Sequence, residues 1–247
     1  MRSERISNSA SVYIFDDIED YATNVFLIEK ETKFYLIDTY CGTDSMKPII
    51  NTIKNTPRQK EVKVINTHFH WDHIWGNCCF KDNCIISHEI CRAFIDKYWE
   101  EQIKESKQYI TGTTEKQLPN LTFKERIFFH DDNIELFYSP GHTVDSISVF
   151  DHKEKILYVG DNLEKPIVYV EHHDIPTYIN TLKSYLGYQP QKIMAGHTLN
   201  IKQEDIFDTI EYLEGLLAGK EMLFASNYAR KVHSRNLKAV QNIISVY

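Results

Sequence analysis

The sequence lacks the usual marks of a secreted or membrane protein. Its five cysteines are odd in number and form no C-x-x-C pair, so no disulfide framework is indicated. No apolar run is long enough to cross a bilayer. The first nine residues contain no apolar segment typical of a secretory signal. We therefore expect a reduced, cytoplasmic protein with no membrane partner.

The chain also lacks linkers and an excess of positive charge. No repeat or Pro/Gly/Ser-rich stretch divides its 247 residues, so we expect a single domain over 1–247. A formal net charge of −7 argues against nucleic acid as a partner and favours a small-molecule substrate. We interpret one basic stretch as a solvated helix face; it contains Arg230, Lys231, His233, Arg235 and Lys238.

The apolar pattern predicts strands and helices in two similar passes. The first pass contains predicted strands at 12–15, 24–29, 34–38, 62–66 and 84–87, with helices at 44–55 and 88–108. The second contains predicted strands at 134–139, 146–150, 155–160 and 192–195, with helices at 175–186 and 204–217. Antiparallel strands followed by strand–helix units indicate two facing sheets with helices outside.

Several residues mark the expected helix ends. Asp174 is a suitable N-cap, and Pro176 suits the first turn that follows it. Gly219 is a typical stop for the helix that precedes it. His88 opens the predicted helix at 88–108, and we interpret it as a local cap.

Four metal-competent side chains stand within six positions after the apolar run Val62–Ile65: His68, His70, Asp72 and His73. By composition, such a pattern is expected by chance on the order of once in a thousand chains. A strand would place His68 and His70 on one face, because alternate side chains point the same way. Imidazole and carboxylate groups suit Zn²⁺. One ion with an open position usually takes three protein ligands, so four indicate two ions.

Three further residues have a shared setting that suits metal binding. His142, Asp161 and His197 each directly follow a glycine at the end of a predicted strand. A glycine there allows the tight turn and the close backbone approach that a cleft requires. We expect these three side chains to join the histidine cluster in one site.

These motifs, in this order, resemble the metallo-β-lactamase-fold hydrolases over roughly residues 10–220. The resemblance implies an α+β fold, a four-layer αββα sandwich with the metals at one edge of the paired sheets. It also implies a ligand set for each ion. His68, His70 and His142 would hold the first metal, Asp72, His73 and His197 the second, and Asp161 would bridge both.

Within that family the chain is most similar to the hydroxyacylglutathione hydrolase (glyoxalase II) and lactonase branches. Family β-lactamases generally lack the bridging Asp that Asp161 supplies here. The diiron oxygen reductases have Glu at the position of His70 and carry a flavodoxin domain. The chain departs from the lactonases at Glu164, where that group has Tyr.

The motifs predict a dinuclear metallohydrolase that acts on a small ester, thioester or lactone. Two divalent ions, zinc first and iron or manganese as alternatives, would share a hydroxide as the nucleophile. Asp72 would orient that nucleophile and accept or pass a proton. Two alternatives stay open: phosphodiester hydrolysis at the same centre, and a non-hydrolytic iron or redox protein.

Other residues near the motifs are expected to support the site or to pack in the core. Asp38 either supports a metal ligand from behind or caps a turn, with equal weight. Trp71 and Trp75 flank the cluster, and we expect them to pack in the core rather than to line the substrate mouth. Cys78 and Cys79 are expected to be buried thiols rather than ligands.

Two longer segments could border the site. Residues 88–122 are longer than a connector needs, and we expect packing on the sandwich, a cap over the site or the surface of a homodimer. Residues 220–247 are expected to form a helical tail. Tyr169, His172 and His173 follow Asp161 closely enough to reach the rim of a cleft.

Overall fold

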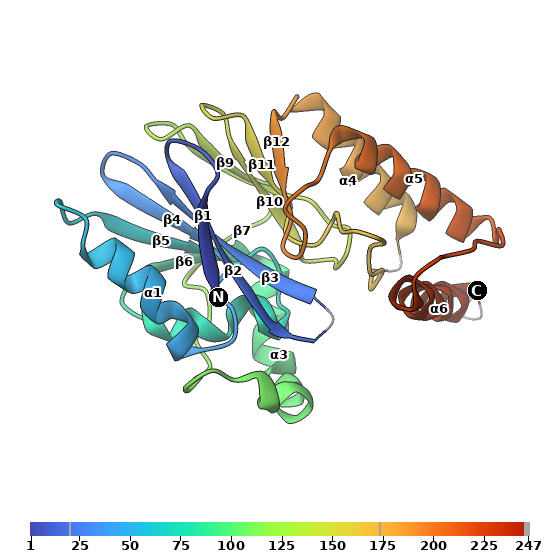
Figure 1. The fold of residues 1–247 in the computed structure, drawn as a ribbon, viewed down its shortest axis with the longest axis horizontal. Coiled ribbons are helices and arrows are strands. Elements are labelled where there is room, and N and C mark those ends of the chain that lie inside the picture. Colours follow the sequence, from blue (N-terminus) through green and yellow to red (C-terminus); the bar gives the residue numbers. More distant parts are fainter. Residues whose placement is uncertain (20, 173, 245–247) are drawn as a thin grey trace.

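Two β-sheets face each other, and helices cover their outer faces (Figure 1). The structure is a computed structural model that describes residues 1–19, 21–172 and 174–244, without the side chains of 241–244. This arrangement confirms the predicted four-layer αββα sandwich. His173, which we expect at the rim of a cleft, lies outside the described residues.

The larger sheet changes from antiparallel to parallel pairing along its width. Its strands are β1 (Arg2–Arg5), β2 (Ala10–Ile18), β3 (Tyr21–Glu29), β4 (Lys33–Ile37), β5 (Glu61–Ile65), β6 (Cys84–His88) and β7 (Leu121–Phe123). Short connections join β1 to β4 as antiparallel neighbours. Long crossovers separate β4 to β7, so these strands pair in parallel.

The smaller sheet repeats the same plan. Its strands are β8 (Arg126–Phe129), β9 (Ile134–Tyr138), β10 (Ile147–Asp151), β11 (Ile156–Tyr158) and β12 (Lys192–Met194). Antiparallel pairing joins β8 to β11 in order, whereas β11 and β12 pair in parallel across a helical crossover. Consequently β9, β11 and β12 run in the same direction, and their C-terminal ends lie at one edge.

Helices connect the strands and pack on the two outer faces. They are α1 (Thr43–Lys54), α2 (Trp71–Ile74), the 3₁₀ helices η1 (Trp75–Phe80) and η2 (Lys107–Tyr109), α3 (Glu89–Ser106), α4 (Ile175–Gly187), α5 (Gln203–Leu217) and α6 (Asn227–Ile244). In Figure 1, α1 covers the larger sheet, and α4 and α5 cover the smaller one. Within the described chain, no helix is long and apolar enough to span a membrane.

Alternation of side chains along the strands separates the layers. In β4, Tyr35 and Ile37 point into the core between the sheets, whereas Phe34 and Leu36 point toward α1. Both faces are buried, so the strand is apolar at nearly every position rather than at alternate ones. This explains why continuous apolar runs predicted the central strands correctly.

Three strands were missed: β1, β7 and β8. The first, with the sequence RSER, is exposed at all four positions, so it has no apolar pattern to recognise. β7 and β8 have three and four residues, too short for a periodicity to show. All three lie at the edges of their sheets. A strand can join an edge through the free backbone N–H and C=O groups there, without burying its own side chains.

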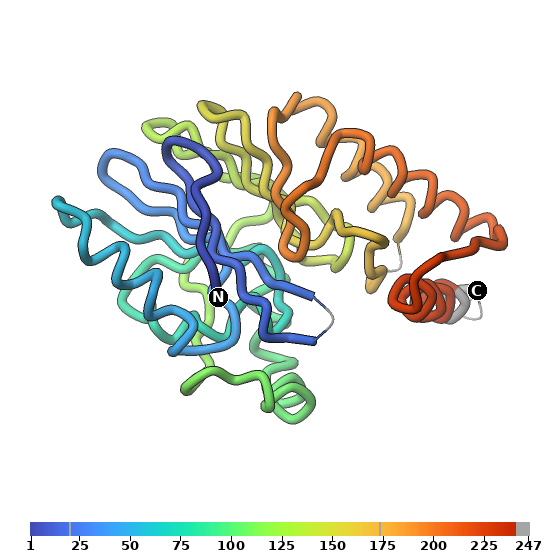
Figure 2. Tube along the Cα trace, viewed as in Figure 1, coloured from blue at the N-terminus to red at the C-terminus, as the bar shows by residue number. Residues whose placement is uncertain are grey.

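The C-terminal helix α6 is fastened to the loop that follows β11 (Figure 2). The buried Asn236 donates hydrogen bonds from its amide to the carbonyl of Val168 and the hydroxyl of Tyr212. Its amide oxygen accepts a bond from the backbone N–H of Val170. A single buried side chain thus satisfies both backbone groups of the loop and holds α6 beside it.

Candidate metal centre

Loops at the C-terminal ends of four strands carry the predicted ligands. His68 and His70 follow β5, and α2 then holds Asp72 and His73. The remaining three, His142, Asp161 and His197, follow β9, β11 and β12. The backbone N–H of Ile147 donates to the carbonyl of Thr67, 2.9 Å away, and this bond joins the loop after β5 to the smaller sheet.

The expectation that a strand presents His68 and His70 is wrong. Strand β5 ends at Ile65, and both histidines lie in the loop between it and α2. They converge because His70 ends the loop as the N-cap residue of α2, with extended backbone angles. The approach of the two rings therefore depends on the turn, not on the period of a strand.

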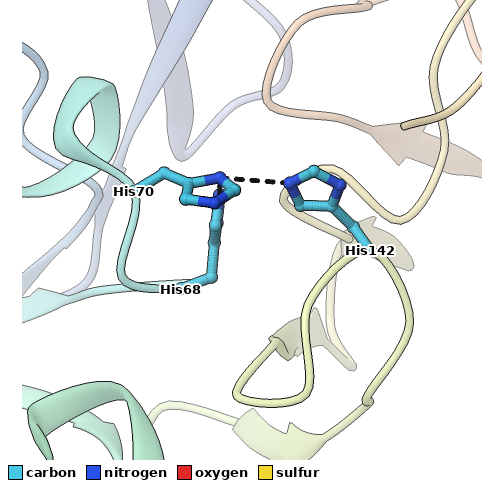
Figure 3. Close-up of side chains that lie close together, drawn as sticks. All are labelled: His68, His70 and His142. Carbon is cyan, nitrogen blue, oxygen red and sulfur yellow. Dashed lines mark hydrogen bonds between the residues drawn. The ribbon is translucent and has the colours of Figure 1, made fainter. Parts of the chain in front are cut away.

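Three imidazoles of the predicted first position converge on one point (Figure 3). The Nε2 atom of His68 lies 3.0 Å from Nδ1 of His70, and Nε2 of His142 lies 3.1 Å from the same atom. Ligands of one ion at about 2.1 Å each lie roughly 3.0–3.5 Å apart in tetrahedral or octahedral geometry. These separations suit a single divalent ion.

The predicted second position is equally compact. The Nε2 atoms of His73 and His197 are 3.4 Å apart. The Oδ2 atom of Asp72 lies 3.7 Å from the first of these nitrogens and 3.6 Å from the second. Two imidazoles and a carboxylate thus face a common point, although 124 positions separate the two histidines in the chain.

Asp161 connects the two groups. Its Oδ2 atom lies 3.5 Å from Nε2 of His68, 3.3 Å from that of His73 and 3.0 Å from that of His197. Its other oxygen, Oδ1, is buried and has no hydrogen-bond partner among the described residues. Burying a carboxylate oxygen without a hydrogen-bond partner is energetically unfavourable unless a cation stabilises the charge. The donor set therefore fits two ions that share Asp161.

Each of the five histidines is held at the ring nitrogen that faces away from the centre. His73 and His70 donate from that nitrogen to the carboxylates of Asp38, 2.8 Å away, and Glu171, 3.1 Å away. Bonding the outer N–H leaves the inner nitrogen with a free lone pair, as metal ligation requires.

Backbone and hydroxyl oxygens hold the other three rings. Nδ1 of His142 lies 3.0 Å from the carbonyl of Tyr169, and Nδ1 of His197 lies 2.9 Å from that of Ala22. Thr67 donates its hydroxyl to Asp38, so its oxygen is available to accept from Nδ1 of His68 at 3.0 Å.

Comparison with known proteins agrees with this geometry. A model of the metallo-beta-lactamase superfamily matches residues 18–197. The chain belongs to the metallo-beta-lactamase superfamily. Membership assigns it to a family of metal-dependent hydrolases. It also confirms the resemblance on which the ligand prediction was based.

Curated relatives within the superfamily are distant in sequence. A "Beta-lactamase-like protein 2 homolog" of Drosophila melanogaster is 25% identical over 230 residues, which are 91% of this chain and 74% of the relative. The protein of the same name in Caenorhabditis elegans is 26% identical over 181 residues. That match covers 71% of this chain but spans only 55% of the relative's length.

Solved structures show the shared superfamily fold. TMB-1 superposes with a TM-score of 0.69 at 19% identity, covering 86% of this chain and 96% of that one. A metallo-beta-lactamase from Pontibacter korlensis gives a TM-score of 0.68 at 18% identity, covering 86% of this chain and 98% of that one.

Burial and the paired charges give the two positions of this superfamily site different electrostatics. At the first position, burial lowers the pKa of His68 well below its usual value and also lowers that of His142. Burial acts in the same direction on His70, but its hydrogen bond to Glu171 outweighs it and raises its pKa.

Burial alone would also lower the pKa of His73 and His197, but the negative charge of nearby carboxylates, above all Asp161, has the larger effect. They raise the pKa of both, that of His197 to about 10. The second position is thus the more strongly negative.

Two glutamates beside the ligands have opposite pKa shifts. Burial raises the pKa of Glu164 to about 8, and the neighbouring carboxylates of Asp161 and Asp72 add to this effect against the opposing His197. Burial also disfavours the charged form of Glu171, but its hydrogen bond to His70 dominates and holds its pKa well below the usual value. The carboxyl of Glu164 lacks the partners that stabilise the charged form of Glu171.

A pocket of about 390 Å³ opens above the centre. Helix α3 contributes Tyr98, Glu101, Gln102 and Glu105 to its wall, and α6 contributes Tyr228 and Arg235. Arg235 pairs with Glu171 at the mouth. Other aromatic rings of the wall are Tyr21, Phe69, Trp71 and Tyr169. The predicted rim residue Tyr169 is therefore in place, whereas His172 is not among the described lining residues.

The other residues near the motifs divide between support and packing. Asp38 supports the centre from behind, because its carboxylate accepts bonds from His73 and Thr67. Trp75 is fully buried, as we expect for a tryptophan that packs in the core, whereas Trp71 lines the pocket. Cys78 and Cys79 belong to none of the candidate ligand groups among the described residues. The expectation that they are buried is wrong, because both are partly exposed.

Proposed function

We propose that this chain is a dinuclear metal-dependent hydrolase of small esters, thioesters or lactones. The supporting observation is the position of Asp161 Oδ2, within 3.5 Å of ligand nitrogens from both groups. Divalent ions held there lower the pKa of water and polarise the oxygen of a scissile carbonyl. Zinc is the first candidate for the three-imidazole position, because borderline nitrogen ligands suit it.

The chain's own residues supply orientation and proton transfer in this proposal. Asp72 lies at the pocket floor, its carboxylate 7% exposed, and it faces both the second position and the substrate space. It can hold the second ion, orient the attacking water and accept or pass a proton. Tyr21 lines the same pocket, and burial, reinforced by the charge of Asp72, raises its pKa. Its hydroxyl therefore stays protonated and can donate to a substrate oxygen.

The pocket wall favours a neutral acyl substrate over a phosphodiester. Glu101 and Glu105 stand exposed on the face of α3 that lines the pocket. Their negative charge repels an anionic phosphodiester. The charge of Arg235 on the opposite wall is paired with Glu171 rather than free for a phosphate. Aromatic rings and a volume of about 390 Å³ suit a small molecule with an apolar part.

Metal content and hydrolysis measured together test the proposal. We expect the purified chain to retain two ions by elemental analysis and to hydrolyse members of a panel of thioesters, lactones and aryl esters. His70→Ala and Asp161→Ala should reduce metal content and lower kcat/KM by about a hundredfold or more, because the ions supply several kcal/mol of transition-state stabilisation. The exposed His130→Ala is the matched control and should change neither.

Three results would contradict the proposal. One is wild-type protein that retains no transition metal after loading. Another is hydrolysis that survives both a chelator and the combination of His70→Ala with Asp161→Ala in one variant. The third is a panel in which only phosphodiesters are cleaved, which would select the alternative reaction at the same centre.

A further inference from the structure

Glu164 adds a carboxylate to the second position that the predicted ligand set does not include. It lies three residues after Asp161 in the loop that follows β11, and 8% of its surface is exposed. Its Oε1 atom is 3.9 Å from Nε2 of His197. Ligand atoms of Asp161, Glu164 and His197 all lie within 4.8 Å of one another.

These separations suit coordination of a common ion. Two ligands at about 2.1 Å from one ion are roughly 3.0 Å apart when cis and 4.2 Å apart when trans in an octahedron. The distance of 3.9 Å from Glu164 to His197 falls inside that interval. Glu164 is thus close enough to complete the shell on the side of Asp161 and His197.

The surroundings of Glu164 favour a cation as its partner. His197 is its one salt-bridge partner in the described part of the chain, and Asp161 and Asp72 nearby are also negative. By contrast, Glu171, the other glutamate beside the ligands, contacts both His70 and Arg235. A buried carboxylate among like charges is unfavourable unless a cation or further hydrogen bonds compensate it.

We propose that Glu164 is an oxygen ligand of the ion held by Asp72, His73 and His197, and that it enables this position to hold a hard ion such as Mn²⁺. With the shared Asp161, the second position would then have two imidazoles and three carboxylates. The first position has three imidazoles and one carboxylate. Oxygen-rich sets with more than four donors suit Mn²⁺, whereas zinc prefers fewer, nitrogen- or sulfur-rich ligands. The inference rests on the proposed two-ion centre.

Stepwise metal loading tests the assignment without using activity. Metal-free full-length protein first receives one equivalent of Zn²⁺, because zinc outcompetes manganese at most sites when both are present in excess. Its metal content is measured by elemental analysis, and Mn²⁺ affinity is then titrated from the EPR signal of the free ion. We expect the wild-type chain to bind one manganese beside the one zinc. In Glu164→Gln and Glu164→Leu, Mn²⁺ affinity should fall about tenfold or more, with zinc at the first position retained.

Glu101→Gln is the matched control, because it removes a pocket carboxylate that belongs to none of the described ligand groups. It should bind Mn²⁺ as the wild type does. Circular dichroism melting of each variant separates a folding defect from a lost ligand, and the isosteric Gln variant should melt like the wild type when zinc-loaded. Unchanged Mn²⁺ affinity in both Glu164 variants overturns the inference alone. A wild-type chain that binds fewer than two ions overturns the two-ion centre and the inference together.

Discussion

Single atoms rather than whole side chains determine the chemistry of the centre. His70 presents Nδ1 to the first position, whereas His68 and His142 present Nε2. The difference follows from Glu171, which holds Nε2 of His70 and leaves its Nδ1 for the ion. The position of the outer acceptor, at one ring nitrogen or the other, thus selects the ligand atom of each ring.

Gly196 is required at its position because two ligands approach its Cα closely. An added Cβ would lie 2.0 Å from Oδ1 of Asp161 and 2.9 Å from Cε1 of His73. We therefore expect Gly196→Ala to displace both ligands and to lower affinity for the second ion about tenfold or more. Isothermal titration of metal-free protein with Zn²⁺ or Mn²⁺ measures this.

Gly187→Ala provides the control for the loss of a glycine. Apart from its chain neighbours and the backbone of its own helix, no heavy atom of the described residues lies within 4 Å of a Cβ added at this last residue of α4. The variant should bind metal normally and should gain up to about 1 kcal/mol of stability, because alanine has less backbone freedom to lose on folding. Equal metal affinity in both alanine variants would contradict the steric argument.

At the scale of elements, helix α3 combines a packing face with a pocket face. Cys91, Ile95 and Trp99 pack with the buried Trp75, whereas Tyr98 and Glu101 face the substrate space. The angle between these faces follows from the helical period, which separates adjacent residues by about 100°. The core contact on one face of the helix therefore fixes which side chains the other face presents to the pocket.

The start of α3 should make stability depend on pH. Nδ1 of His88 accepts a bond from the backbone N–H of Ile90, and Nε2 donates to the carbonyl of Lys124. Only the neutral imidazole can make both bonds. Burial lowers the pKa of His88, so the folded-state value lies below the unfolded value of about 6.5. The stabilisation is fully present above pH ~6.5 and is lost as the pH falls through the folded pKa.

Urea unfolding at about pH 7.5 and pH 5 measures this dependence. His88→Ala should cost about 1 kcal/mol at the higher pH, because a helix cap is lost. The difference between variant and wild type should shrink at the lower pH, because there the unfolded wild-type chain takes up a proton on His88 more readily than the folded one. His130→Ala, at an exposed position, should show no such change. A cost for His88→Ala that is independent of pH would contradict this role.

At the scale of the whole molecule, the centre joins the two halves of the sandwich. His68, His70, Asp72 and His73 come from the half with the larger sheet, and His142, Asp161 and His197 come from the other. A buried ion pair between Lys30 and Asp151, at 2.8 Å, joins the same two halves. Bound ions would therefore stabilise the sandwich as well as activate water.

Removal of metal should lower the melting temperature. Ions present at about a thousand times their dissociation constant add roughly 4 kcal/mol to the folded state, or a shift of about 10 °C for a chain of this size. Differential scanning calorimetry with and without a chelator measures the shift, and added Zn²⁺ should reverse it. Asp161→Ala should respond much less. If the chelator left the wild-type melting temperature unchanged, the coupling between metal binding and stability would be contradicted.

The sequence was sufficient to predict the central strands, the helix caps and the seven candidate ligands. Apolar runs identify strands because both faces of a sandwich strand are buried, as in β4. Asp174 does cap α4 through a bond to the N–H of Thr177, and Gly219 follows α5 with a positive φ of 63°. These signals are local, since each depends on residues within a few positions.

The pocket and the support of the ligands were decided by tertiary structure. Arg235 meets Glu171 across 64 positions, and His197 is oriented by the carbonyl of Ala22 across 175. Neither partner carries a mark in the sequence, because an ordinary arginine or backbone carbonyl acquires its role only when the fold brings it near. Residue chemistry and spacing therefore identified which atoms can bind metal, whereas the packing of distant loops decided which of them meet and what surrounds them.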